Sequence, residues 1–274
     1  MSSKYLWLAS AATLAGLTSG TLPGFVSAAV AAAPVPRDEG PPLVAGGAAL
    51  RPPLERATLP NGLEVYLLPD AGAPLVCVQV WVKVGSVDEY EGRSGTEPGS
   101  GRPSVFDHGI TGLSHFFEHL MFQGTKRFPD YDLALAPLGA RNNAFTYQDA
   151  TVYWAYTPKE HLGHILDIEA DRFGQMKVDF VHLEPEREVV KSERRQNVDA
   201  DPGEIAEERA IKRTFDRFPY RWGPIGWMDD LDSIPLETAQ RYHAEHYTTN
   251  NTVLVVAGDF EPGAALEQIR KTWG

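Results

Sequence analysis

Cysteine is almost absent from this sequence, since Cys77 is the only one among 274 residues. A single thiol cannot form an internal disulfide, and it also excludes a zinc module built on four cysteines. A metal bound by this chain must therefore be held by histidines and carboxylates. Eight histidines and 37 Asp and Glu residues are available for that purpose.

Basic residues are also scarce relative to acidic ones. The chain has 25 Lys and Arg residues against 37 Asp and Glu residues, which leaves a net charge of −12. This balance disfavours nucleic acid or an anionic membrane surface as a bulk partner. The apolar fraction of 43% is ordinary for a chain that buries a core, so the composition is not that of a disordered, collagen-like or coiled-coil protein.

Long apolar runs are confined to the N-terminus. After residue 33 no segment has 18 consecutive apolar residues, so we expect no later membrane span. Residues 1–33 combine a positive start at Lys4 with an uncharged apolar stretch and small-residue cleavage patterns at 26–28 and 31–33. We expect a cleaved signal peptide, because Gly and Pro interrupt the run; an N-terminal anchor is the alternative. The mature protein is expected to be periplasmic or secreted.

Residues 34–53 are rich in Pro, Gly and Ala and are predicted to form a linker, followed by one domain over 54–274. Period-two and helical spacings of apolar residues predict its elements. We expect strands in 54–68 (a hairpin around Asn61-Gly62), 76–84, 142–157 and 251–257, and helices over 113–122, 158–173, 185–197, 203–218, 236–247 and 262–273. Because strands and helices do not alternate strictly, we expect an α+β fold, a mainly antiparallel sheet with helices packed on one face.

Two histidines and a glutamate stand close together in His115-Phe-Phe-Glu118-His119, inside the helix expected at 113–122. Residues four apart lie on one face of a helix, so the two imidazoles can converge on one metal ion, and Glu118 reaches the same face. The order His-x-x-Glu-His is the inverzincin signature. The alternative is a helix without a metal site, in which one histidine is packed, the other is exposed and the glutamate lies on the surface.

A catalytic zinc site needs a third protein ligand and a position for water. Glu193 is our predicted ligand, and Glu186, seven residues earlier on the same helix face, is the predicted second catalytic carboxylate, either supporting the ligands or shuttling protons. Glu118 is the predicted general base, which takes a proton from the metal-bound water and delivers it to the leaving amine. Three neighbouring charged residues are expected only to solvate the helix: Glu184, Arg187 and Glu188.

These residues together resemble the pitrilysin/insulinase family of zinc metallopeptidases, to which mitochondrial processing peptidase and many bacterial exported peptidases belong. The resemblance covers nearly all of residues 54–274. Residues 111–122 are similar to the metal-binding helix of the family, and Glu193 follows His119 by 74 residues within Glu-Arg-Glu-Val-Val-x-x-Glu. Further similar segments are Leu59-Pro-Asn-Gly-Leu63, residues 139–146, Phe218-Pro-Tyr220 and residues 255–259.

The resemblance implies a zinc-dependent endopeptidase that hydrolyses peptide bonds in peptides or unfolded segments. It assigns Zn²⁺ to His115, His119 and Glu193, and water activation to Glu118. It also places Asn143 and Ala144 on an edge strand that pairs with the substrate backbone. An exposed edge binds extended peptides through main-chain hydrogen bonds and so accepts many sequences.

Two features depart from the family pattern. Residues 89–107 insert a stretch rich in Gly, Ser and Pro within 85–111, which we expect to be a surface loop, with a lid as the alternative; His108 beside it is expected to be a loop residue rather than a ligand. In addition, family enzymes generally pair such a domain with a second, similar half. The resemblance therefore implies a homologous second half or partner subunit, and a catalytically incomplete half or a non-hydrolytic assembly subunit is the alternative function.

Overall fold

A six-stranded sheet in the order β1-β2-β8-β3-β7-β6 organises the fold. The structure is a computed structural model that describes residues 54–89, 95–96, 103–104, 109–215 and 218–274. The strands are β1 (Glu55–Thr58), β2 (Glu64–Pro69), β3 (Leu75–Val82), β6 (Arg141–Thr146), β7 (Thr151–Pro158) and β8 (Thr252–Gly258). Only β2 and β8 pair in parallel within this sheet; its other neighbours are antiparallel, as predicted.

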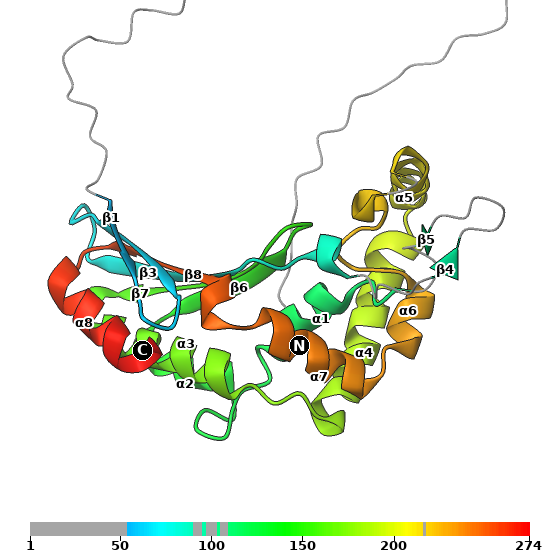
Figure 1. Ribbon diagram of the computed structural model, residues 1–274. Coiled ribbons are helices and arrows are strands. Elements are labelled where there is room, and N and C mark those ends of the chain that lie inside the picture. The colour runs from blue at the N-terminus through cyan, green and yellow to red at the C-terminus, as the bar shows by residue number, and fades with distance from the viewer. Residues whose placement is uncertain (1–53, 90–94, 97–102, 105–108, 216–217) are drawn as a thin grey trace, which may run out of the picture. The chain divides into compact units, whose positions relative to one another are not determined.

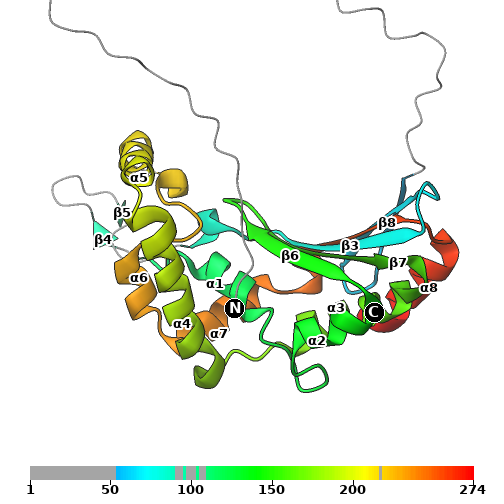
Figure 2. The same ribbon diagram turned by 180° about the vertical axis from the view of Figure 1, so that it is seen from behind.

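Helices cover one face of this sheet and continue beyond one end of it. They are α1 (Leu113–Leu120), α2 (Tyr131–Leu135), α3 (Leu162–Gln175), α4 (Phe180–Arg194), α5 (Pro202–Thr214), α6 (Met228–Ser233), α7 (Leu236–His246) and α8 (Pro262–Trp273). Figures 1 and 2 show α2, α3 and α8 along the sheet, with α1 between the sheet and α4. The expected α+β architecture is confirmed.

The alternating burial of side chains along β3 shows that the two faces of the sheet have different environments. Val78, Val80 and Val82 are buried on the helix side. There they join the apolar residues of α3 and α8, such as Ile165 and Ile269, in one core. On the other face, side chains are only half-buried; they include Cys77, Trp81, Trp154, Tyr156 and Val255. One face of the sheet thus carries the core, and the other keeps partly exposed aromatic rings.

The predicted hairpin around Asn61-Gly62 is confirmed, since β1 and β2 pair in antiparallel register across it. The Asn61 side chain stabilises the turn in two ways. Its Oδ1 accepts a hydrogen bond from the Leu63 main-chain nitrogen at 3.2 Å, and its Nδ2 donates to the Trp273 carbonyl at 2.6 Å. The first hairpin is thereby fastened to the last helix of the chain.

Several sequence predictions fall outside the described residues: the signal peptide (1–33), the linker (34–53) and His108. The insertion at 89–107 is described only in part. Within it, β4 (Gly95–Thr96) pairs with β5 (Pro103–Ser104), a short pairing that the sequence did not predict. A stretch of Gly, Ser and Pro has no periodicity that could indicate such short strands.

The start of α4 differs from the prediction that Pro185 opens a helix. The helix begins at Phe180, because the Asp179 side chain accepts a hydrogen bond from the His182 main-chain nitrogen at 3.1 Å and caps the first turn. Pro185 lies inside the helix, where its missing N–H leaves only a carbonyl of the exposed first turn without a donor. Pro158 ends β7 and also caps a 3-10 helix over Lys159–His161, which leads directly into α3 at Leu162, so the helix predicted to start at Pro158 is confirmed.

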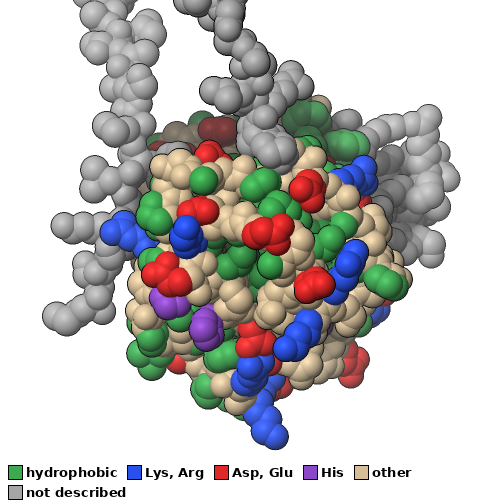
Figure 3. Space-filling model, turned by 90° about the vertical axis from the view of Figure 1, so that its left-hand side faces the viewer, with side chains coloured by type: hydrophobic (Ala, Val, Ile, Leu, Met, Phe, Trp, Pro, Cys, Tyr) green, Lys and Arg blue, Asp and Glu red, His purple; other side chains and the backbone are tan. Residues whose placement is uncertain are grey.

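The apolar character of the helices and the charges on the surface bear on contacts with membranes and with charged partners. None of the helices of the described residues combines the length and the apolar character needed to cross a bilayer. Figure 3 views the side that lies at the left in Figure 1, and acidic, basic and hydrophobic side chains are intermixed over it. That side therefore presents no extended field of a single charge sign.

The turn that leads into α1 depends on a glycine. Gly112 has φ +89°, and a Cβ at this position would lie 2.6 Å from the Ile225 carbonyl oxygen. An L side chain here would meet both backbone strain and a steric clash. Gly139 also has a positive φ, +58°, but a Cβ there would meet no atom within 4 Å among the described residues.

We predict that Gly112→Ala lowers the free energy of unfolding by about 3 kcal/mol or more, because strain and overpacking add. Gly139→Ala is the matched control, and its loss should stay near about 1 kcal/mol, since it meets strain alone. Urea unfolding of the two zinc-free variants measures both losses. Equal losses would contradict the assigned clash with Ile225.

Candidate metal centre and active site

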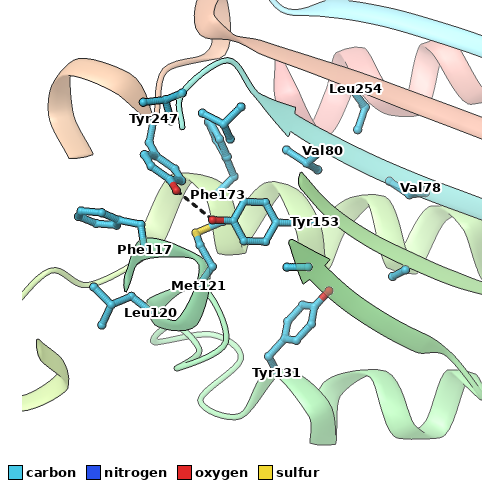
Figure 4. Packing of buried hydrophobic residues seen from close by; sticks show 14 of the residues in the cluster. Val78, Val80, Phe117, Leu120, Met121, Tyr131, Tyr153, Phe173, Tyr247 and Leu254 are labelled. Carbon is cyan, nitrogen blue, oxygen red and sulfur yellow. Dashed lines mark hydrogen bonds between the residues drawn. The ribbon is translucent and has the colours of Figure 1, made fainter. Parts of the chain in front are cut away.

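The short helix α1 has one apolar face that packs into the core and a second face that carries ionisable side chains. Its buried apolar side chains are Leu113, Phe116, Phe117 and Leu120. Figure 4 shows Phe117 and Met121 beside Tyr153 and Tyr247, whose hydroxyls are hydrogen-bonded to each other at 2.9 Å. This packing leaves His115, Glu118 and His119 on the remaining surface of the helix, as the spacing predicted.

A buried carboxylate holds the N-terminus of α1. The two oxygens of Glu89 accept hydrogen bonds from the main-chain nitrogens of Gly112 and Ser114, each at 2.7 Å. These nitrogens are among the donors that a helix N-terminus leaves unpaired, so Glu89 satisfies them. Its burial raises the pKa of Glu89 to about 8, although the two main-chain hydrogen bonds act in the opposite direction. Sequence analysis assigned Glu89 only to the start of the insertion and missed this role.

Arg187 fixes α4 to its neighbour and does not solvate the helix, so that expectation was wrong. Its guanidinium is buried and donates to the main-chain carbonyls of Leu231 and Ile234, at the end of α6. Glu184 pairs with the same guanidinium at 3.0 Å. A lone arginine in a charged stretch gives no signal of such a contact, because its partners are main-chain atoms 44 and 47 residues away.

The three predicted metal ligands lie together. The Nε2 atom of His119 lies 3.3 Å from Oε2 of Glu193, and Nε2 of His115 lies 3.9 Å from the same oxygen. The two imidazole rings have centroids 4.7 Å apart. One ligand atom from each residue falls within 4.8 Å of the others.

This arrangement fits a tetrahedral zinc ion. Ligands at zinc distances of 2.0–2.1 Å lie about 3.4 Å from one another, which is close to the observed separations. Two imidazoles and a carboxylate are also a common donor set for catalytic zinc. His115, His119 and Glu193 could therefore hold zinc and leave a fourth position open.

Glu186 orients His119 from the side opposite Glu193. Its Oε1 lies 2.8 Å from Nδ1 of His119, and its Oε2 accepts a hydrogen bond from Nε2 of Gln123 at 2.5 Å. A carboxylate that accepts the Nδ1 proton leaves the Nε2 lone pair for a metal. Of the two roles predicted for Glu186, this position favours supporting the ligand.

The charges around the two histidines act on them in opposite ways. Burial opposes protonation of His119, but the hydrogen bonds and charges of Glu186 and Glu193 outweigh it and raise its pKa to about 9. Burial and the nearby His119 lower the pKa of His115 to about 4. Nδ1 of His115 is buried and has no hydrogen-bond partner among the described residues. The hydrogen bond from His119 lowers the pKa of Glu193.

Glu118 faces the same site from α1. Its Oε2 accepts a hydrogen bond from the Thr146 hydroxyl at 2.6 Å. Burial raises the pKa of Glu118, while the Thr146 hydrogen bond acts against that rise. A carboxylate with a raised pKa is a better proton acceptor, which suits a general base.

The helix geometry changes two residues after Glu193, where α4 ends. A single π-helical turn runs over Arg195–Asp199, and π turns occur frequently at functional sites. Within it, Nδ2 of Asn197 donates to Oε1 of Glu193 at 3.3 Å. That contact occupies the carboxylate oxygen that does not face the histidines.

The strand β6 forms an edge of the sheet, next to Glu118. Its register pairs Asn143 with Trp154 and Ala144 with Tyr153. The main-chain nitrogen of Tyr147 donates to Ala150, and bonded pairs alternate along an antiparallel ladder. The main-chain groups of Asn143 therefore face β7, whereas those of Ala144 face outward, at the free edge.

Sequence analysis missed four residues that complete this site: Glu89, Gln123, Thr146 and Asn197. Thr146 stands at the end of a segment singled out for the edge strand, so alternation along that strand could have indicated it. The other three act through contacts between segments that are distant in the chain or across one helical turn, and their residue types are common on surfaces.

Two models of one peptidase family match this chain. An insulinase (peptidase family M16) domain model matches residues 107–221, and a model described as the peptidase M16 inactive domain matches residues 233–274. Together the two matches cover more than half of the chain. The protein belongs to the insulinase (M16) family of peptidases, which confirms the resemblance drawn from the sequence.

Relatives and solved structures agree with this membership. The chain is 30% identical to a zinc protease, PqqE, of Helicobacter pylori over 80% of its length, and 28% identical to a probable mitochondrial-processing peptidase subunit beta of Arabidopsis thaliana over 78%. A solved protease structure from Helicobacter pylori matches 81% of the chain with a TM-score of 0.72 and 30% identity. The periplasmic protease PqqL of Escherichia coli matches 80% with a TM-score of 0.67 and 23% identity, which bears on the fold alone.

The chain spans about half the length of the relatives it matches, or less. It covers 46% of the Helicobacter pylori zinc protease, 37% of the Arabidopsis thaliana subunit and 50% of the solved Helicobacter pylori protease. The segment matched as the inactive domain contains β8, which lies at the centre of the sheet beside β3.

We predict that zinc binding releases about one proton at pH 7.5, because His119 must lose the proton that Glu186 and Glu193 stabilise up to pH about 9. The dissociation constant should then fall about tenfold per pH unit between pH 7 and 8.5. The same raised pKa also affects the stability of the metal-free protein. The contribution of protonated His119 to the free energy of unfolding is fully present below pH 6.5, its pKa in the unfolded chain, and is lost as the pH rises through about 9, its pKa in the folded protein. Calorimetric titration in buffers of different ionisation enthalpy measures the proton count.

Glu186→Gln is the matched control for this measurement, since it removes one charge that keeps His119 protonated. The variant should release fewer protons near neutral pH than the wild type does. A wild-type protein that takes up zinc at pH 7.5 without releasing protons would contradict the proposed state of His119.

Proposed function

We propose that residues 54–274 form the catalytic domain of a zinc-dependent endopeptidase that hydrolyses peptide bonds in peptides or unfolded segments. The observation that carries this proposal is the convergence of His115, His119 and Glu193 within ligand distance, with Glu118 on the same face of α1. Membership in a peptidase family and similarity to proteins named zinc proteases support it.

His115, His119 and Glu193 would hold the zinc ion. When bound, zinc acts as a Lewis acid that lowers the pKa of water and polarises the carbonyl of the scissile bond. The protein supplies the ligands in fixed positions: α1 is held at its N-terminus by Glu89, and α4 is held on α6 by Arg187. Glu186 and Asn197 fix the orientation of His119 and Glu193.

Glu118 is the proposed general base. It accepts a proton from the attacking water and then donates that proton to the leaving amine, so the same carboxyl serves both steps. Burial raises its pKa, which favours proton acceptance from water, and the Thr146 hydrogen bond prevents free rotation of the carboxylate. Glu186 acts on this reaction indirectly, because its carboxylate is occupied by His119 and Gln123.

The substrate would pair with the free edge of β6. An extended peptide can bind the outward main-chain groups of Ala144, while the side chain of the neighbouring Asn143 lies on the half-buried face of the sheet. Folded proteins seldom offer an unpaired extended segment, so this mode favours peptides and unfolded segments.

A homologous second half or partner subunit would complete the substrate site. The chain spans about half of its relatives, and the face of the sheet away from the helices keeps half-buried aromatic rings, among them Trp81 and Trp154. A non-hydrolytic assembly subunit is the alternative function, but an intact set of three ligand side chains and a general base favours the enzyme. The N-terminal residues 1–33, as a signal peptide, and 34–53, as a linker, would send the domain to the periplasm or outside the cell.

We predict that Glu118→Gln reduces hydrolysis of an internally quenched peptide by at least about 100-fold, because it removes the proton acceptor. Its zinc content should equal that of the wild type, since the three ligands remain. Glu188→Gln, which alters an exposed carboxylate of α4, is the control and should retain activity. Wild-type rates in Glu118→Gln would refute the proposed mechanism.

Adding a homologous second half should raise the turnover of the full chain, because the substrate would then be enclosed on two sides. Co-expression of the two halves, followed by the same peptide assay and by metal analysis, measures this effect. A pair no more active than the chain alone would show that a second half is not required. A chain that binds about one zinc and hydrolyses nothing in any pair would favour the assembly subunit.

A further inference from the structure

Thr146 is the last residue of β6, and its main chain faces the free edge of the sheet. It pairs with Thr151 in the register in which Tyr147 and Ala150 form a hydrogen-bonded pair. Because bonded and non-bonded pairs alternate, the N–H and C=O of Thr146 point away from β7, as do those of Ala144. These are the main-chain groups available to an added peptide strand.

The side chain of the same residue points to the helix side of the sheet. Side chains alternate along a strand, and Thr146 shares its face with Ala144, whose side chain is buried. From there its hydroxyl donates to Oε2 of Glu118 at 2.6 Å. Among the hydrogen bonds of the described residues, this is the side-chain link between β6 and the predicted general base.

We propose that Thr146 is a positioning residue that ties the orientation of Glu118 to the pairing of the substrate with β6. This inference rests on the proposed function. One residue offers its main chain to the peptide and its side chain to the base. A peptide that pairs with the edge therefore fixes the strand that holds Glu118, and it brings the scissile bond to a carboxylate already turned toward the metal ligands.

Threonine suits this role better than a more flexible residue. Its β-branched side chain has restricted rotation in a strand, so the hydroxyl keeps its direction. Its partner in the register, Thr151 of β7, is buried, and its hydroxyl donates a hydrogen bond to the Val84 carbonyl at 3.0 Å. This bond fixes the end of β7 that pairs with Thr146. A hydroxyl bound to one oxygen of Glu118 leaves the other oxygen to receive a proton.

The test compares Thr146→Val, which keeps the shape and removes the hydroxyl, with Thr146→Ser, which restores it. In the full chain, with a second half where turnover needs one, we expect Thr146→Val to lower kcat about 10- to 100-fold with KM within about twofold. Zinc content and the melting temperature of the zinc-bound protein should not change. Thr146→Ser should recover most of the lost kcat.

Thr157→Val is the matched control. It makes the same substitution in the same sheet, at a buried hydroxyl that donates to the Leu138 carbonyl at 2.7 Å and touches no residue of the site. Its kcat should equal that of the wild type. A loss of kcat in Thr157→Val as large as in Thr146→Val would overturn the proposal, since any damage to the sheet would then suffice.

Peptides methylated at one main-chain nitrogen at a time test the link to substrate pairing. In the wild type, methylation at the position that faces Thr146 should lower kcat as well as raise KM. In Thr146→Val the same methylation should raise KM alone, so the two changes are not additive in kcat. Additive effects would overturn the link between pairing and base orientation.

The outcomes separate this proposal from the proposed function. A wild-type protein that hydrolyses peptides, combined with unaltered kcat in Thr146→Val, would overturn the role of Thr146 alone. A wild-type protein that neither binds zinc nor hydrolyses peptides with any second half would overturn both. A Thr146→Val variant that loses zinc would also count against the proposal, because the hydroxyl would then act through the metal ligands.

Discussion

The contact between His119 and Glu186 is the interaction on which the site depends, because it joins the two helices that carry its chemistry. Neither α1 nor α4 alone holds a full ligand set: α1 contributes two imidazoles and α4 one carboxylate. The hydrogen bond between Nδ1 and Oε1 at 2.8 Å brings the helices together and sets which ring nitrogen faces Glu193. Leaving the buried Glu186 carboxylate without this partner would cost several kcal/mol, so the two helices are strongly coupled.

The remaining polar contacts of the core hold those two helices in place. Glu89 satisfies the N-terminus of α1, and Arg187 satisfies carbonyls at the end of α6 while fixing α4. Both side chains are buried and form hydrogen bonds to main-chain groups, and Arg187 also pairs with Glu184. Buried polar and charged groups are tolerated when they are bonded in this way. The sheet adds the third element, since β6 has a free edge and its Thr146 hydroxyl donates a hydrogen bond to Glu118. The free edge of β6 and the proposed general base thus meet at one end of one strand.

Much of the fold could be predicted from residue patterns, because they reflect local physics. Alternation in 76–84 predicted β3, and the hairpins and the later helices followed from turn residues and apolar spacing. Pro185 misled the prediction, because the Asp179 cap starts the helix earlier than the proline suggests. Arg187 looked like one charge among many, because its partners are main-chain carbonyls that no pattern in the sequence marks. The short pair β4 and β5 has too few residues to show a period.

The sequence by itself determined which groups could act: His115, Glu118 and His119 share a face because a helix repeats every 3.6 residues, and Glu186 and Glu193 share another for the same reason. The absence of cysteine pairs left histidines and carboxylates as the donors for a metal. Tertiary structure alone decided that the two faces meet, that Glu186 contacts Nδ1 rather than Nε2 of His119, and that Thr146 reaches Glu118. Those outcomes depend on how a core packs elements that are distant in the chain, which local periodicity does not encode.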